Sequence, residues 1–548
     1  MIDSQSLHSR REAIDSEIRA LKARLAILKS QRNTVALISQ LPTEILTHIL
    51  SLLRLDGRHD SSRLKATHVC RRWREVALAC PYLWSEVTSL RRLNGILELI
   101  RRAKNVDLTF DIDETFPTTN VILGQLVTHI GRTQTLKLEI DYRNWRWCNS
   151  LLMSKPAPAL QSLQLVSTTD IEYQLPSDMF MGTCPPLRSL SLRRCFVNFS
   201  SPLFHCELTH LTLIDICAFV DEENGFTKNY TTELLNALRE LPCLLELHIS
   251  RPSPPWVVVD SNLASHATIP LPHLKLLYLE AHVNYCSGLV SHFVLPYFTR
   301  LKLSSELWET IPPIEATVEN AAVAAATQFL RQYIGNLAGD TRVASVCFTD
   351  GYQRQAPGAT LNISPVDPSS DLFNHNSVSS LPGSLEIYLT GESHSLGQAI
   401  FRALGAILPL HEMRSCSLAG YFNHAEADWY PLIQQSKNVT TLVVGGNMVD
   451  GFAKALATLS QQDHTVRPYP RLRHLRIENA AFVRGSPESF CSALCAGFDD
   501  GRSLALSLRS CSIKEAHIRV LKRHFTSVKW DGSESGERWG RDTDEGNE

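Results

Sequence analysis

The chain has 548 residues, of which 44% are hydrophobic and 20% are charged, and its formal net charge is −2. A chain of this length exceeds the size of one hydrophobic core, so we expect several domains or an array of repeats. The near balance of charges excludes the basic surface that nucleic acid or an anionic membrane selects, and no nucleic-acid partner is expected. No apolar run approaches the ~20 residues of a membrane helix, so we expect no membrane contact.

Residues 1–38 carry a heptad pattern. Spacings of four and three residues alternate along Ile14, Ile18, Leu21, Leu25 and Leu28, and after an interruption at Arg32 the pattern ends at Val35. This is the a/d seam of a coiled coil, although three heptads are near the lower limit for a stable one. Two interpretations stay open: residues 14–35 form a homodimer zipper, or the segment is an amphipathic helix that folds back on its own domain.

Residues 39–90 are expected to form a small all-α domain. The stretch LPTEILTHILSLL predicts a helix that begins near Pro42 and gathers its apolar residues on one face. A second helix is predicted from Val69 to Cys80, where Pro81 ends it. A unit of about 50 residues with this many large apolar side chains is expected to bury part of its surface against a partner.

Three motifs in this segment carry a family resemblance: LPxEIL from Leu41, VCRxWRxVA from Val69 and PxLW from Pro81. Together they resemble the F-box, in the form common in the expanded F-box families of fungi, although the polar connection from 55 to 63 is a departure from that pattern. The resemblance implies binding to a Skp-type adaptor, which joins the chain to cullin and RING subunits. The residues that it implies for box packing and adaptor contact are Leu41, Pro42, Ile45, Leu46, Ile49, Val69, Cys70 and Trp73.

From about residue 91 the chain repeats the cassette L-x-x-L-x-L at irregular spacings. Its clearest copies begin at Leu160, Leu187, Leu208, Leu244, Leu274, Phe298, Val439 and Leu472. Two apolar residues one apart predict a short strand with one buried face, and stretches such as 232–241 and 513–525 between strands can form helices. Residues 91–530 are therefore expected to form an α/β, curved leucine-rich-repeat-like solenoid with a parallel sheet.

Two segments depart from the repeat. Residues 309–380 break the period and are expected to contain an insertion, with a helix candidate at 319–334 and a strand candidate at 343–352. Residues 531–548 have few apolar groups and an acidic excess, which predicts a disordered tail.

The residue between the two apolar positions of each strand points away from the core. These positions mix aromatic, cationic and polar types, which favours a protein-binding surface, and Tyr278, Lys302 and Arg476 are the candidates for target binding. Trp145 and Trp147 lie among arginines, a composition typical of interface hot spots. They are equally well explained as core residues at a domain junction.

The sequence offers no sign of catalysis, of a cofactor or of a metal. The common phosphate-binding, nucleophile and zinc motifs are missing, so we expect no enzyme. The 14 cysteines include no C-x-x-C pair, and Cys184, Cys195, Cys206 and Cys217 are better explained by repeat packing than by a metal. Buried thiols and a charged N-terminus predict a cytoplasmic or nuclear protein without disulfides.

The expected function is that of a substrate-recognition subunit of an SCF-type cullin-RING ubiquitin ligase. Such a subunit makes no bond itself, but holds a target protein close to the ubiquitin-charged enzyme. The alternative is a repeat-array scaffold for protein interactions that acts outside a ubiquitin ligase. The sequence does not reveal the identity of the target.

Overall fold

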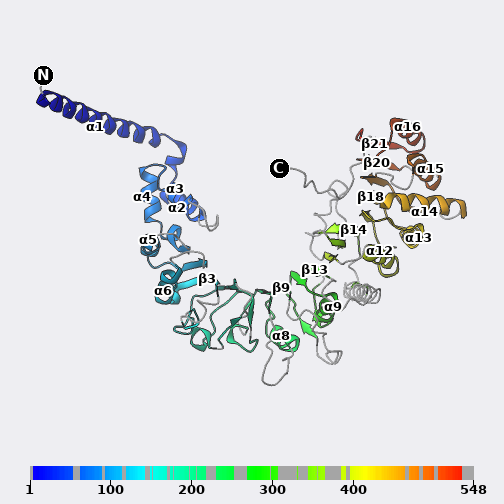
Figure 1. Ribbon diagram of the computed structural model, residues 1–548, viewed down its shortest axis with the longest axis horizontal. Helices are drawn as coiled ribbons and strands as arrows, with labels where there is room; N and C mark the ends of the chain where they lie inside the picture. The colour runs from blue at the N-terminus through cyan, green and yellow to red at the C-terminus, as the bar shows by residue number, and fades with distance from the viewer. Residues whose placement is uncertain are drawn as a thin grey trace. The chain divides into compact units, whose positions relative to one another are not determined.

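The computed structural model divides into two compact units, Met1–Cys206 and Glu207–Glu548 (Figure 1). The structure describes residues 4–53, 62–88, 93–113, 119–141, 148–150, 152–168, 173–176, 178–196, 198–204, 207–216, 230–251, 268–296, 298–306, 327, 330, 343–353, 356–364, 384–390, 395–462, 468–480, 486–498 and 504–533. Of the expected helix at 319–334 only residues 327 and 330 are described, both as helical, and of the expected tail at 531–548 only residues 531–533 are described. Trp145 and Trp147 lie outside these ranges. In the described ranges, no helix is both long enough and apolar enough to cross a membrane.

The first unit begins with helices. They are α1 (Ser4–Thr34), η1 (Leu37–Gln40), α2 (Thr43–Leu52), α3 (Ser62–Ala66), α4 (Arg71–Ala79), η3 (Pro81–Trp84), α5 (Leu93–Ala103), α6 (Thr119–His129), η4 (Ile130–Arg132), η5 (Met179–Gly182) and η6 (Pro202–Phe204). The two predicted helices of the small domain are confirmed as α2 and α4. The helix expected in residues 1–38 is α1, and the residues of its seam from Ile14 to Leu28 are exposed.

A parallel sheet follows in the same unit. Its strands are β1 (Glu86–Thr88), β2 (Leu108–Asp113), β3 (Thr133–Ile140), β4 (Ser162–Ser167) and β6 (Ser189–Arg193), while β5 (Tyr173–Gln174) pairs separately with β7 (Cys195–Phe196). Each strand of the main sheet pairs in parallel with the next. The repeated leucines are in register, since Leu136 lies beside Leu163 and Leu163 beside Leu190. The predicted parallel arrangement is confirmed here.

The second unit is a larger sheet with one helix after most strands. Its strands are β8 (His210–Ile214), β9 (Glu246–Ser250), β11 (Leu276–Glu280), β13 (Arg300–Glu306), β14 (Ser345–Gln353), β15 (Ala356–Ser364), β16 (Leu385–Thr390), β17 (Ser415–Gly420), β18 (Thr441–Gly446), β19 (His474–Glu478), β20 (Ala505–Arg509) and β21 (Ser527–Trp530), and β10 (Ile269–Pro270) pairs with β12 (Phe293–Val294). Its helices are α8 (Tyr230–Arg239), α9 (Val283–Ser291), α12 (Ser395–Ile407), α13 (Glu426–Gln435), α14 (Met448–Gln462), α15 (Pro487–Gly497) and α16 (Glu515–His524). The two helices predicted at 232–241 and 513–525 are confirmed as α8 and α16.

The prediction of an entirely parallel sheet is wrong at one place. The segment that breaks the repeat forms a hairpin, β14 and β15, which is inserted between β16 and β17. Strand β15 runs antiparallel to both of its neighbours, whereas β14 pairs in parallel with β17. Because a short connection can only return the chain in the opposite direction, the two residues between the hairpin strands force this antiparallel pairing.

The repeated apolar residues form the core beneath the helices. In unit 2, Leu211, Leu247, Leu277 and Leu301 lie side by side on successive strands and are all buried. Helix α14 packs on β17 and β18, and α12 packs on β14 and β15. These strands therefore cover their apolar faces with helices and with neighbouring strands, as the repeat predicts.

Most described cysteines belong to this core as neutral thiols. Burial raises the pKa of Cys148 and of Cys347 to about 12, so neither ionises near neutral pH. The prediction of free thiols is wrong for Cys184, which is bonded in a disulfide. The turn at Cys184 brings its Sγ within 3.3 Å of the Pro202 carbonyl oxygen, a proximity across 18 residues that the sequence spacing did not reveal. Among the described residues, no group of three His, Cys, Asp or Glu side chains could hold a metal.

Candidate functional site

The small helical domain has a well-packed inner face. Leu46 and Leu50 of α2 are fully buried, as are Leu83 and Trp84 of η3. Helix α4 contributes Ala77, also fully buried. These side chains come from three short elements that contact one another, and they form the core of the domain.

The same elements leave other large apolar side chains in solvent. These residues, called here the outer apolar face, are Ile45, Leu52, Leu64, Val69, Leu78 and Tyr82. Ile45 and Leu52 are seven residues apart, so they share one side of α2, while Leu46 and Leu50 turn inward. Isolated exposed apolar residues are ordinary, but this many in so small a domain make it a candidate interaction surface.

The structure divides the eight residues that the sequence proposed for packing and contact. Leu46 is core, whereas Pro42, Ile45 and Val69 are exposed, and the remaining four, Leu41, Ile49, Cys70 and Trp73, are half-buried. Cys70 has a local structural role, since its Sγ accepts a hydrogen bond from the Trp73 backbone N–H at 3.5 Å and caps α4. The sequence missed the contribution of Leu52, Leu64, Leu78 and Tyr82 to the outer apolar face. Their signal was that they are apolar residues outside the buried stripe of each helix.

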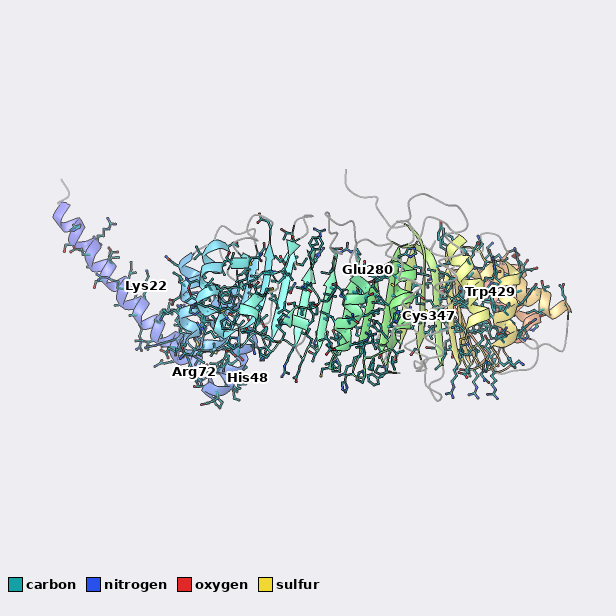
Figure 2. The ribbon with its side chains drawn as sticks, turned by 90° about the horizontal axis from the view of Figure 1, so that it is seen from below. Lys22, His48, Arg72, Glu280, Cys347 and Trp429 are labelled. Atoms are coloured by element: carbon teal, nitrogen blue, oxygen red, sulfur yellow. The ribbon has the colours of Figure 1, made fainter. Side chains whose placement is uncertain are left out.

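Arg72 holds the chain segment that leads into the domain, a role that sequence reasoning also missed. Its guanidinium donates hydrogen bonds to the backbone carbonyl oxygens of Ser39 and Leu41. These bonds tie the segment before α2 to α4. Figure 2 labels Arg72 and, on α2, His48. The arginine therefore orients the Leu41–Pro42 step that precedes the outer apolar face.

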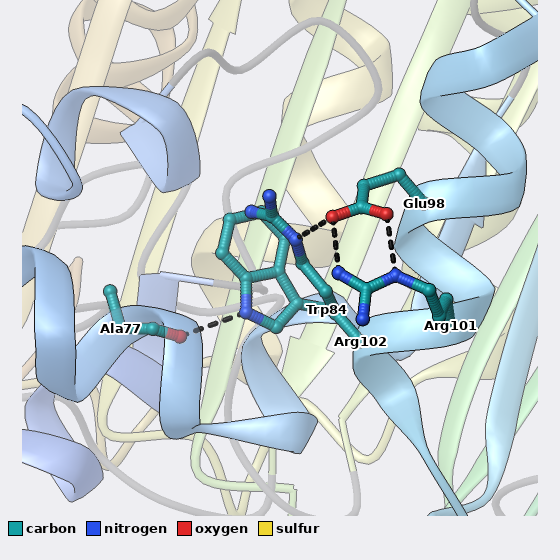
Figure 3. Close-up of polar contacts among 5 residues, drawn as sticks. All are labelled: Ala77, Trp84, Glu98, Arg101 and Arg102. Carbon is teal, nitrogen blue, oxygen red and sulfur yellow. Dashed lines mark hydrogen bonds and ion pairs between the residues drawn. The ribbon is translucent and has the colours of Figure 1, made fainter.

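A tryptophan joins the domain to helix α5 (Figure 3). Trp84 Nε1 donates a 2.8 Å hydrogen bond to the Ala77 carbonyl oxygen, and the Arg102 guanidinium lies 4.7 Å above the indole ring. Glu98 binds Arg101 and Arg102 at 2.6 Å each. The hydrogen bonds from Arg101 and then Arg102 lower the pKa of Glu98 to about 2. The contact of Arg102 with Trp84 holds α5 against η3 of the domain.

The candidate target-binding residues occupy one register row of unit 2. Tyr278 lies between His248 and Lys302 on adjacent strands, with ring centroids of Tyr278 and His248 4.3 Å apart. Lys302 Nζ is 2.9 Å from Glu386 Oε2. All of these side chains are half-buried. The structure thus brings Tyr278 and Lys302 together.

Arg476 belongs to the same row but is six strand pairings beyond Lys302. At ~4.8 Å per strand this is roughly 29 Å, so one small epitope cannot reach both. The row between them is not free, since Cys347 and Val443 are buried. The expectation that every such position is open to solvent is therefore wrong at Val443.

A buried ionisable pair in unit 2 was not foreseen. His424 Nε2 lies 2.5 Å from Asp350 Oδ2, the Phe422 backbone N–H donates to Asp350 Oδ1 at 3.2 Å, and neither ionisable side chain is exposed. A Cβ at Gly420 would lie 1.9 Å from Asp350 Oδ1, so the last position of β17 requires glycine. Phe401 packs 4.4 Å from the imidazole, between ring centroids. Because neither side chain reaches solvent, we assign this pair a structural role.

The geometry defines a chain with a small helical domain that exposes apolar residues, followed by repeated strand and helix units. Comparison with family models identifies residues 38–89 as an F-box-like domain. No curated protein matches the chain. Among solved structures the chain is similar to one from the crystal structure of the Rad7 and Elc1 complex in yeast, at 12% identity over 87% of this chain and 93% of that chain. The TM-score of 0.22 is too low for that likeness to carry an argument.

Proposed function

We propose that the chain is the substrate-recognition subunit of an SCF-type ubiquitin ligase. The observation that carries this proposal is the outer apolar face of the F-box-like domain, whose residues surround a core that is already complete. A Skp-type adaptor would cover Ile45 and Val69, and would connect the chain to cullin and RING subunits. The protein would form no covalent bond itself and would act by positioning its target.

The adaptor step is tested by placing charge on the outer apolar face. Burying one such side chain is worth about 1.5–3 kcal/mol. The double substitution Ile45→Asp and Val69→Asp should therefore reduce adaptor affinity by more than about a hundredfold, measured by calorimetry with the purified adaptor. A matched control is Val520→Asp on α16, because Val520 is 43% exposed and Val69 is 58% exposed. Unchanged affinity in the double variant, with native circular dichroism, would refute the proposal.

The remaining residues would form the target-recognition part, a leucine-rich-repeat-like solenoid of a fungal-type F-box protein. The in-register parallel strands and their covering helices support this interpretation. Target binding would use the row around Tyr278 and Lys302, with Arg476 contacting a second part of a large target. Tyr278→Ala with Arg476→Ala should weaken target capture, which proximity labelling under proteasome inhibition can measure. The same variant should leave adaptor affinity unchanged.

A second candidate is a scaffold that binds partners outside any ligase, and it would share the same outer apolar face. Recovery of cullin with the chain and the adaptor separates the two functions. A complex that contains the adaptor but lacks cullin would favour the scaffold. Both candidates are non-catalytic and would operate in the cytoplasm or the nucleus.

A further inference from the structure

Helix α1 presents an apolar seam that no other described part of unit 1 covers. The seam residues Ile14, Ile18, Leu21, Leu25 and Leu28 are 41–63% exposed, and the described neighbour of the helix is η1, which directly follows it. A helix of 31 residues gains most of its stability in proteins from packing its apolar face. An exposed seam of five large side chains, about 21 Å long at 1.5 Å per residue, therefore requires a partner.

The heptad positions restrict what that partner is. With Ile18 and Leu25 at a, and Ile14, Leu21 and Leu28 at d, a second α1 in parallel register would give five successive apolar layers. Reversing the second helix opposes a with d positions and leaves only four such layers, because Leu28 then faces Arg11 of the other copy. Apolar burial therefore favours the parallel arrangement.

The flanking charges complement the same arrangement. In a parallel pair, each g residue faces the e residue five positions later in the other helix. This matches Glu17 with Lys22 and Arg10 with Asp15, and each match occurs twice by symmetry. The single unfavourable match is Arg24 with Lys29. Figure 2 shows Lys22 projecting from the free surface of α1.

We propose that α1 forms a parallel, in-register, two-stranded coiled coil with α1 of a second copy of this chain. Two F-box-like domains would then follow from the same end of the coiled coil, since η1 and α2 begin directly after α1. The proposal does not depend on adaptor binding, because α1 lies outside residues 38–89.

The mass of the purified full chain without adaptor, measured by sedimentation equilibrium, tests self-association. We expect a dimer at micromolar concentration and a monomer after Leu25→Asp. The matched control is Ile27→Asp, since Ile27 is as exposed as Leu25, 50% against 51%, but lies on the opposite side of the helix. A monomeric wild-type chain, or equal loss of dimer in both variants, would overturn the proposal.

A charge exchange tests the orientation. Glu17→Lys alone and Lys22→Glu alone each create two like-charge matches, so each should weaken the dimer by at least about fivefold. The double variant Glu17→Lys with Lys22→Glu should recover the wild-type dissociation constant. In an antiparallel pair Glu17 faces Arg24 instead, and Lys22→Glu would not rescue Glu17→Lys. Absence of rescue would therefore overturn the parallel geometry.

Discussion

The F-box-like domain and the sheet of unit 2 differ in how far their own chain covers their side chains. In the domain, apolar side chains such as Ile45 and Val69 remain in solvent although its core is complete. In unit 2, even Asp350 and His424 are enclosed, and they contact each other through Oδ2 and Nε2. The first region leaves apolar side chains uncovered by its own chain, whereas the second supplies its own neighbours through repetition.

The largest effect is expected where the interior of unit 2 is disturbed. His424→Ala leaves the Asp350 carboxylate buried with the Phe422 N–H as its described donor, and loss of one member of a buried pair costs about 3–5 kcal/mol. The midpoint of urea unfolding, followed by circular dichroism, should fall accordingly. His411→Ala is the control, because His411 is 72% exposed and its contact with Glu412 should be worth less than about 1 kcal/mol. Similar midpoints for the two variants would contradict the structural role of the pair.

Adjacent residues on α2 provide a sharper comparison. Leu46→Ala removes a fully buried side chain and should destabilise the domain by about 2–5 kcal/mol. Ile45→Ala should change stability by no more than about 0.5 kcal/mol while weakening adaptor binding. Thermal unfolding and adaptor titration of both variants would measure the two effects, and an unstable Ile45→Ala variant would show that Ile45 is core.

A smaller effect is expected at the junction with α5. Trp84→Phe keeps an aromatic ring beneath Arg102 but removes the hydrogen bond to the Ala77 carbonyl oxygen. The Ala77 carbonyl oxygen still accepts the Cys80 backbone N–H, so loss of the indole bond should cost about 0.5–1.5 kcal/mol, which thermal unfolding can detect. An unchanged unfolding midpoint would mean that a water molecule replaces the indole N–H as the donor to the Ala77 carbonyl oxygen.

The smallest effect concerns Glu98, which is exposed to solvent. Its pKa falls from 4.5 to about 2 in the folded chain, so its stabilising contribution is present above pH 4.5 and disappears as the pH falls towards 2. The difference in unfolding midpoint between the wild type and Glu98→Gln should therefore shrink over this interval. A difference that stays constant from pH 5 to pH 2 would contradict the ion pairs with Arg101 and Arg102.

The sequence predicted the strands better than their directions. The spacing of Leu277 and Leu279 identified β11 and its buried face, because a period of two is characteristic of strands. Apolar residues also occupy every second position of β15, at Ala359, Leu361 and Ile363. Such a pattern is the same whether the strand runs parallel or antiparallel to its neighbours. The hydrophobic pattern therefore could not reveal that β15 is antiparallel.

The site was predictable to a similar degree. The motif residues located the F-box-like domain, yet helical periodicity could not separate Ile45 from Leu46, because both are large, apolar and adjacent. The Asp350–His424 pair joins residues 74 positions apart, and neither belongs to a motif. Such pairings depend on tertiary packing, and a single sequence carries no local sign of them.

The inserted hairpin also sets an order of events for folding. Strand β13 pairs with β16, where Leu301 meets Leu385, and not with β14, the next strand along the chain. Closing this long loop costs chain entropy before the pairing contributes, so the step is slow compared with the addition of neighbouring repeats. During synthesis, β14 and β15 emerge before β16 and β17, the two strands that flank them. Until β16 and β17 have been synthesised, the outer edges of the hairpin have no strand to pair with. This is the interval in which the growing chain is most exposed to aggregation.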